Sequence, residues 1–294
     1  MKSTKNFTRI AATLLCLLAF ASASFAAKTN PLSYPSGLAV DAAGNLWVAN
    51  NLDNNILVFG ANYKQLPDET ITQGINGPTG IAFDSFGNLW VADNRNNTVT
   101  EYTGGVQDTG ATITNGISQP EAIAVDGLNN VWVANTFNAD GGGYDTSFTV
   151  YAPGTVYGPG SNLLMTFGPY PTLLYGIVVS EGAFVYGDGN YLNLTPASVA
   201  IATGSVSGVN VGGNNTAVWV ASAANGTIYF TTTDNAVNYA KPASLGSASQ
   251  LFGLSFAPSG IAVDSVRGRI YISNGPGNVI EVYSTGGTLL KTIN

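Results

Sequence analysis

Residues 35–50 read PSGLAVDAAGNLWVAN, and the same pattern of sixteen residues recurs twice without a gap. The copies are PTGIAFDSFGNLWVAD at residues 78–93 and PEAIAVDGLNNVWVAN at residues 120–135. The three copies begin 43 and 42 residues apart. This period is typical of the blades of a β-propeller rather than of helical solenoids.

Three weaker copies extend the repeat along the chain. PSGIAVDSVRGRIYISN at residues 258–274 carries one extra residue, and degenerate copies occupy residues 175–189 and 207–223. The chain therefore contains six units, which corresponds to roughly 45 residues per blade. A seven-bladed alternative requires a hidden unit, for which residues 227–256 are the best candidate.

Each unit can be divided into strands. An apolar run of the type Ile-Ala-Val-Asp predicts the innermost strand, Asp-x-x-Gly-Asn predicts a hairpin turn, and Leu-Trp-Val-Ala predicts the second strand. Inner strands that are apolar on both sides indicate a sheet packed on both faces, as in a propeller. We therefore predict an all-β, six-bladed propeller of four-stranded antiparallel blades. Third strands are expected at residues 55–60, 98–103 and 279–284, and fourth strands at 162–168 and 288–293.

The four tryptophans align at one position of the predicted second strand. Because a large aromatic side chain contributes most when it is buried, we expect all four to lie in the core. Stacking on a ligand is the alternative role. The residues are Trp47, Trp90, Trp132 and Trp219.

The pattern resembles the NHL-repeat family. Its units run from a Pro-x-Gly-Ile start through an Asp turn and Gly-Asn to a Val-Ala-Asp or Val-Ala-Asn ending, followed by an Asn-rich turn. The resemblance implies a propeller, but such families include scaffolds, binding modules, lyases and lactonases. The lyases that it resembles rely on histidine, and this chain has none, so their activities are not transferred.

The amino terminus is typical of a secretory signal peptide. Lys2, Lys5 and Arg9 precede an apolar run at residues 10–20, and small residues follow at 21–27. The run is about half the length needed to cross a bilayer, so a retained anchor is the weaker alternative. We predict a cleaved leader at residues 1–26, a single propeller domain at 27–294, and a secreted protein of the periplasm or the extracellular space.

Composition excludes several chemistries. The chain has no His and one Cys, Cys16, which lies in the predicted leader. Histidine catalysis, Cys/His zinc sites and disulfides are therefore excluded in the mature protein. Without the leader, seven basic face 17 acidic side chains, a balance of about −10. This acidity disfavours nucleic acids and anionic membranes as partners. We expect a monomer that does not insert into membranes.

Strand direction places candidate functional residues at one end of the predicted channel. In antiparallel strands, the start of the first and the end of the second lie at the same end of a blade. The residues expected to bind a ligand there are Glu121, Asn50, Asp93, Asn135 and Asn274, together with the neighbouring Ser36, Asn51, Thr79, Asn94 and Ser259.

Glu121 departs from the repeat, because the equivalent residues are Ser36, Thr79 and Ser259. With Asp93 and Asn135 it could form an oxygen-ligated site for Ca²⁺ or another hard divalent cation. The gluconolactonase-like propellers are similar in holding a divalent cation with Glu, Asn and Asp. The alternative is a solvated Glu121 at the rim. The recurring aspartates are expected to cap turns at the opposite end of the channel; they are Asp41, Asp84, Asp126 and Asp264.

Two functional hypotheses remain. The first is a non-enzymatic secreted scaffold that binds a protein, peptide or glycan at the channel mouth and uses neither a cofactor nor catalytic residues. The second is a divalent-cation-dependent lactonase or esterase-like hydrolase, with the metal held by Glu121, Asp93 and Asn135.

Overall fold

The computed structural model describes residues 30–136, 146–153, 163–170, 175–187, 192–197, 200, 217–241 and 248–294. The predicted leader, residues 1–26, lies outside this part of the chain. Leu32–Asn294 forms one compact unit. Within the described residues, no helix combines the length and apolar character needed to cross a membrane.

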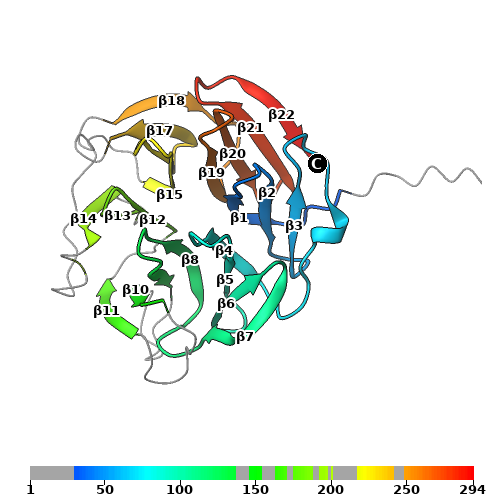
Figure 1. The fold of residues 1–294 in the computed structure, drawn as a ribbon. Coiled ribbons are helices and arrows are strands. Elements are labelled where there is room, and N and C mark those ends of the chain that lie inside the picture. The colour runs from blue at the N-terminus through cyan, green and yellow to red at the C-terminus, as the bar shows by residue number, and fades with distance from the viewer. Residues whose placement is uncertain are drawn as a thin grey trace, which may run out of the picture. The chain divides into compact units, whose positions relative to one another are not determined.

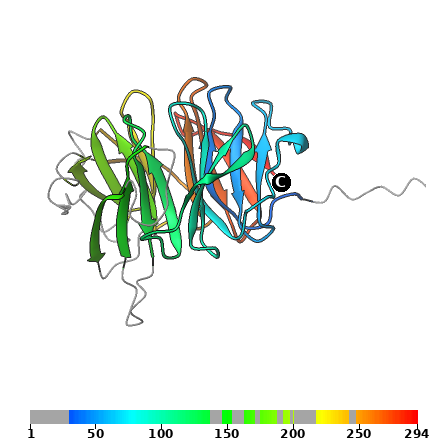
Figure 2. The same ribbon diagram turned by 60° about the horizontal axis from the view of Figure 1, so that its bottom comes forward.

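Six antiparallel sheets surround a common axis in the unit Leu32–Asn294 (Figures 1 and 2). The prediction of an all-β, six-bladed propeller is therefore confirmed. Blade one consists of β1 (Pro35–Val40), β2 (Leu46–Asn50) and β3 (Asn55–Phe59). Blade two consists of β4 (Pro78–Phe83), β5 (Leu89–Asp93), β6 (Thr98–Thr103) and β7 (Val106–Ile113). Blade three consists of β8 (Pro120–Val125), β9 (Val131–Asn135), β10 (Thr146–Tyr151) and β11 (Leu163–Tyr170). Blade four consists of β12 (Gly176–Ser180), β13 (Ala183–Gly187) and β14 (Leu192–Pro196). Blade five consists of β15 (Ala217–Ser222), β16 (Ile228–Thr232), β17 (Ala236–Ala240) and β18 (Ser249–Gly253). Blade six consists of β19 (Gly260–Asp264), β20 (Arg269–Asn274), β21 (Val279–Ser284) and β22 (Leu289–Ile293).

Within each blade, consecutive strands are hydrogen-bonded neighbours. Four sheets have four strands, and blades one and four have three among the described residues. In blade one, two short bridges, Ile56 to Ile71 and Phe59 to Gln65, continue the sheet outside β3. A short 3₁₀ helix, η1 (Pro67–Glu69), follows β3. The innermost strands are β1, β4, β8, β12, β15 and β19, and each contacts its neighbours around the ring.

The predicted aspartate turns explain why the first two strands fold back. Asp41 accepts hydrogen bonds from the backbone N of Asn45 at 2.8 Å and from Trp47 Nε1 at 3.0 Å. Asp126 receives the equivalent bonds from Asn130 N at 2.9 Å and Trp132 Nε1 at 3.0 Å. One carboxylate thus holds the turn and orients the tryptophan of the next strand, which confirms the aspartates as turn caps.

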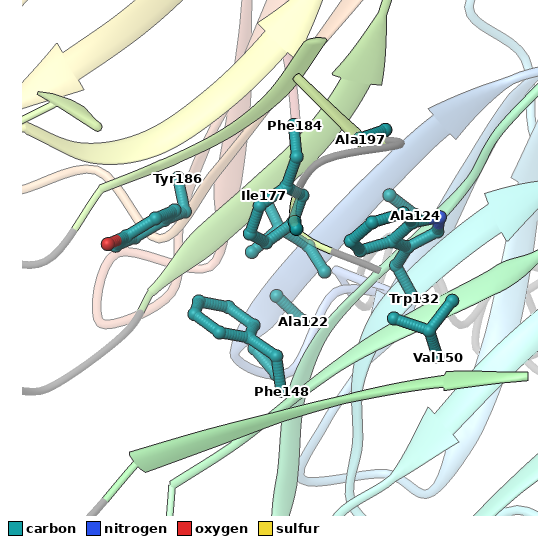
Figure 3. Packing of buried hydrophobic residues seen from close by; sticks show 11 residues of the cluster. Ala122, Ala124, Trp132, Phe148, Val150, Ile177, Phe184, Tyr186 and Ala197 are labelled. Carbon is teal, nitrogen blue, oxygen red and sulfur yellow. The ribbon is translucent and has the colours of Figure 1, made fainter. Parts of the chain in front are cut away.

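The core lies between neighbouring blades. Trp132 and Phe148 of blade three point toward Phe184 of blade four (Figure 3), and all three are fully buried. The rings of Trp132 and Phe184 stack with centroids 4.7 Å apart, and Phe148 meets Phe184 edge to face at 4.9 Å. Trp47 and Trp90 are also buried. Three of the four tryptophans are therefore core residues, as predicted.

Blade six closes the ring without a strand from the amino-terminal end. All its strands, β19 to β22, come from the carboxyl-terminal end, so blades one and six join through packed faces. Leu38 of β1 and Tyr271 of β20 belong to one buried cluster. Ser273 Oγ donates to Ser36 O at 2.8 Å, and the Arg269 guanidinium lies 4.7 Å from the centroid of the Tyr63 ring.

Blade five differs from the sequence prediction. The sequence pattern predicts a second strand for the run that contains Trp219, but this run forms β15, the innermost strand, and β16 is its partner. Residues 227–256, the candidate for a seventh blade, contribute to the outer strands of this same blade. The misassignment arose because Val-Trp-Val-Ala resembles the second-strand motif of the first three copies. Trp219 is consequently not equivalent to Trp47, Trp90 and Trp132.

Candidate functional site

The Pro-x-Gly start of the repeat is explained by crowding around the channel. A Cβ on Gly37 would lie 2.2 Å from Thr79 O of the next blade, and a Cβ on Gly260 would lie 2.2 Å from Ser36 O. Only a residue without a side chain fits these approaches. Below them runs a channel of about 300 Å³, lined mainly by short apolar segments of the six innermost strands.

A second cavity of about 390 Å³, the mouth cavity, lies at the entrance where these strands begin. We call the position of Gly37 and Gly260 the crowded position. In every blade, the residue that precedes this position lines the mouth cavity. These six residues are Ser36, Thr79, Glu121, Tyr175, Val218 and Ser259. Tyr34, Asn51, Asn94, Arg95, Trp219 and Pro258 complete the lining. The structure thus brings Glu121 together with Ser36, Asn51, Thr79, Asn94 and Ser259 at one end of the channel, and their binding of a ligand stays a prediction.

Glu121 is partly exposed and lines the mouth cavity. In blades one and two the equivalent hydroxyl bridges to the next blade, Ser36 Oγ to Pro78 O at 3.1 Å and Thr79 Oγ1 to Pro120 O at 2.7 Å. An ionised carboxylate has no hydrogen to donate. The Glu121 side chain accepts a long hydrogen bond from Asn94, 3.5 Å from Nδ2 to Oε2. Burial raises the pKa of Glu121 to about 7.

Two aromatic side chains stand beside Glu121. Trp219 occupies in blade five the position of Gly37 and Gly260, and it lines both the mouth cavity and the channel below. Its Nε1 donates to Pro258 O at 3.1 Å, which fixes the indole toward blade six. The rings of Tyr175 and Trp219 meet edge to face with centroids 6.3 Å apart. Burial raises the pKa of the Tyr175 phenol, and the negative charge of Glu121 adds to the rise.

Arg95 supplies the positive charge of the mouth cavity. Its guanidinium donates to Asn54 Oδ1 at 3.2 Å and to Asn51 Oδ1 at 3.4 Å, both in blade one. Among the described residues the single salt bridge joins Arg267 to Asp264, so Arg95 and Glu121 do not pair with each other. The cavity therefore has one anionic and one cationic side.

The structure places Asn50, Asp93 and Asn135 in buried positions, and they are not among the residues that line the mouth cavity. Each accepts a hydrogen bond from the segment that enters its own blade. The donors are Ser33 N to Asn50 Oδ1 at 2.6 Å, Asn76 N to Asp93 Oδ1 at 3.1 Å, and Ser118 N to Asn135 Oδ1 at 3.0 Å. Asn274 accepts from Gly277 N at 2.9 Å within its own turn. These four residues hold loops together rather than facing the cavity.

The proposed metal trio is consequently not brought together at the mouth. Glu121 lines the cavity, whereas Asp93 and Asn135 bond to the entering segments of blades two and three. Across the part of the chain that the structure describes, no group of three or more His, Cys, Asp or Glu residues is placed to hold a metal ion.

Asp93 differs from its two equivalents in one atom. Asn50 Nδ2 donates to Asn55 Oδ1 at 3.0 Å, and Asn135 Nδ2 donates to Thr149 Oγ1 at 3.3 Å. In Asp93 the corresponding atom is Oδ2, which is buried and makes no hydrogen bond. Burial raises the pKa of Asp93 to about 7, although the bond from Asn76 N opposes this.

Sequence reasoning missed Tyr34, Arg95 and Tyr175 as cavity residues and assigned Trp219 to the core. A signal for Trp219 was present. Asn225-Gly226 followed by Ile228-Tyr229 repeats the spacing of Gly268 followed by Ile270-Tyr271. Aligning these hairpin turns places Trp219 on the innermost strand.

Comparisons with known proteins support the fold. Residues 76–102 match the family model of the NHL repeat, so the family predicted from the sequence is confirmed. No curated protein sequence matches the chain. Three solved structures are similar over most of their length. The chain shares 16% identity with a selenomethionine-substituted virginiamycin B lyase from Staphylococcus aureus, with a TM-score of 0.57 over 80% of this chain and 75% of that one.

The second structure is a streptogramin B lyase, with 14% identity and a TM-score of 0.62 over 90% and 84% of the two chains. The third is a nidogen/laminin complex, with 16% identity and a TM-score of 0.64 over 85% and 93%. At these identities the similarity shows the fold alone. Another structure of the virginiamycin B lyase is described as catalytically inactive after one histidine was replaced by alanine. The present chain has no histidine.

Proposed function

We propose that this NHL-repeat propeller is an exported, non-enzymatic binding module that takes a protein, peptide or glycan at its mouth cavity. The observation that carries the proposal is the lining of that cavity. Aromatic rings, side-chain amides and one charge of each sign converge on a space of about 390 Å³. Such a mixture of apolar faces and a few placed polar groups is characteristic of ligand sites.

The cavity offers the kinds of contact that dominate binding energy. Tyr34 is 40% exposed, and Tyr175 and Trp219 line the cavity with it. Aromatic side chains and Arg are enriched among the residues that contribute most to interfaces. Arg95 is held by two amide oxygens, so it loses little conformational freedom when it meets a partner.

The divalent-cation hydrolase remains the alternative and has less support. Its metal would depend on Glu121 together with Asp93 and Asn135, yet the last two side chains serve the loops of their own blades. A hard cation such as Ca²⁺ takes six to eight oxygen ligands. Beside Glu121 the cavity presents the rings of Tyr175 and Trp219.

The proposal is tested on arrays of random peptides and of glycans, probed with the purified protein. Tyr34→Ala and Arg95→Ala remove side chains from the mouth, and Phe86→Ser removes a side chain that is 79% exposed in an aspartate turn at the other end of the channel. We expect array signals that fall at least about tenfold in the mouth variants, as at a typical hot spot, and persist in the control. Signals that are absent, or that all survive both mouth substitutions, would contradict the proposal.

A further inference from the structure

We propose that the ligand carries an organic ammonium group, bound between the Glu121 carboxylate and the rings of Tyr175 and Trp219. This inference rests on the proposed binding function, because it names the chemistry recognised at the same cavity.

The first argument is the missing countercharge of Glu121. Glu121 carries the single carboxylate among the residues that line the mouth cavity. The Asn94 amide approaches Oε2 only at 3.5 Å, and Arg95 is directed to Asn51 and Asn54. A largely buried carboxylate without a cationic partner is unfavourable by several kcal/mol. A cation in the ligand would remove this cost and gain a charge-assisted hydrogen bond.

The second argument is the aromatic neighbourhood. Glu121, Tyr175 and Trp219 all line the mouth cavity, and the Tyr175 ring meets Trp219 edge to face, so the three side chains form one cluster. The faces of aromatic rings attract cations, and Trp does so most strongly. A carboxylate beside two rings therefore matches an ammonium group on a carbon skeleton, whose charged end meets the carboxylate and whose methylene groups lie against the rings.

The third argument concerns selectivity. Trp219 also lines the channel below, so its side chain stands at the inner end of the mouth cavity. Strands β15 and β12 lie close together at this point, since a Cβ on Gly176 would lie 2.8 Å from the Cα of Trp219. Arg95 bonds to Asn54 and Asn51 of blade one and does not pair with Glu121. A ligand with one ammonium group and a neutral or anionic remainder fits this charge arrangement better than a polyamine does.

The test compares two small probes of nearly equal shape, benzylammonium and uncharged benzyl alcohol, by calorimetric titration of the purified protein. We expect saturable binding of benzylammonium at least about tenfold tighter than that of the alcohol. Glu121→Gln should reduce the amine affinity at least about tenfold and leave the alcohol unchanged. Arg95→Gln removes the repelling charge and should strengthen amine binding. N-acetyl-lysine methylamide, titrated alongside, shows whether a peptide lysine is accepted as well as a free amine.

Matched controls separate folding from recognition. Glu121→Gln and the Phe86→Ser control are both compared with the original protein by melting temperature before titration. Equal affinities for amine and alcohol, an amine affinity unaffected by Glu121→Gln, or no saturation up to about 10 mM would overturn the inference. If the arrays show mouth-dependent binding of uncharged or anionic ligands only, the ammonium inference fails and the binding function stands. If no ligand binds at the mouth, both fail.

Discussion

Replacing Asp93 by Asn is expected to stabilise the propeller at neutral and alkaline pH. The side chain is fully buried, and its Oδ2 makes no hydrogen bond. The equivalent Asn50 and Asn135 place an amide nitrogen at this point and donate from it. Asp93→Asn keeps the acceptor for Asn76 N, introduces the missing donor and removes the buried charge.

The magnitude follows from the pKa. Burial raises the pKa of Asp93 from 3.8 to about 7. The folded protein therefore holds a proton that the unfolded chain has lost between about pH 4 and pH 7, and stability falls as the pH rises through that window. Above pH 7 the lost stability reaches about 4 kcal/mol, at about 1.4 kcal/mol for each tenfold difference in proton affinity. The Asn variant should recover a substantial part of this.

Urea unfolding of both proteins at pH 5 and pH 8 measures the effect. We expect the stability advantage of Asp93→Asn to be at least about 2 kcal/mol larger at pH 8 than at pH 5, with the m-value unchanged. Asn135→Asp, the reverse change in blade three, should introduce the same pH-dependent loss. An advantage that is equal at both pH values, or a variant less stable than the original at pH 8, would refute the reasoning.

Three further predictions concern the core, the channel and the mouth. Trp132→Ala should cost about 3–5 kcal/mol in urea unfolding, because it removes a fully buried ring stacked on Phe184; a loss below about 1 kcal/mol would contradict the packing. Gly37→Ala should lower stability by more than about 1 kcal/mol, because its Cβ would lie 2.2 Å from Thr79 O, and an unchanged melting temperature would count against the crowding. Benzylammonium binding should weaken about tenfold from pH 8 to pH 6, since protonation removes the charge of Glu121 near pH 7, and Glu121→Gln should abolish this dependence. The other ionisable side chains that line the cavity, which the Gln variant leaves in place, are Tyr34, Tyr175 and Arg95.

The repeat predicted the propeller because its key residues act locally. An aspartate such as Asp41 bonds to backbone amides and to a tryptophan within six positions, so its role can be derived from spacing alone. The mouth of the channel could be predicted only in part. Ser36 and Glu121 lie inside the repeated motif, and strand direction places them. Tyr34 and Arg95 lie outside it, and their positions depend on loops whose geometry the repeat does not determine.

Buried polar residues were the hardest to assign. From sequence, Asp93 and Asn135 were equally suited to bind a ligand or to hold a loop, because both roles use oxygen atoms at the end of a second strand. The choice depends on where each side chain turns. The entering segment supplies a backbone N–H to each of them, and a buried N–H must find an acceptor. At these positions the side chain therefore accepts a hydrogen bond from the entering loop instead of facing the channel mouth.

The six residues that precede the crowded position divide the ring into two parts. In blades one and two a small hydroxyl residue ties its strand to the next blade, and in blade six Ser259 accepts a bond from Gly275 N at 2.8 Å. Blades three to five carry Glu121, Tyr175 and Val218 there, and blade five adds Trp219 in place of a glycine. The ends of the ring meet between blades six and one, where Ser273 Oγ donates to Ser36 O at 2.8 Å. The departures fall on the opposite side, where they give up one class of inter-blade bond and gather a carboxylate and two aromatic rings around one cavity. This distribution agrees with the proposed binding site, which uses the residues of one half of the propeller.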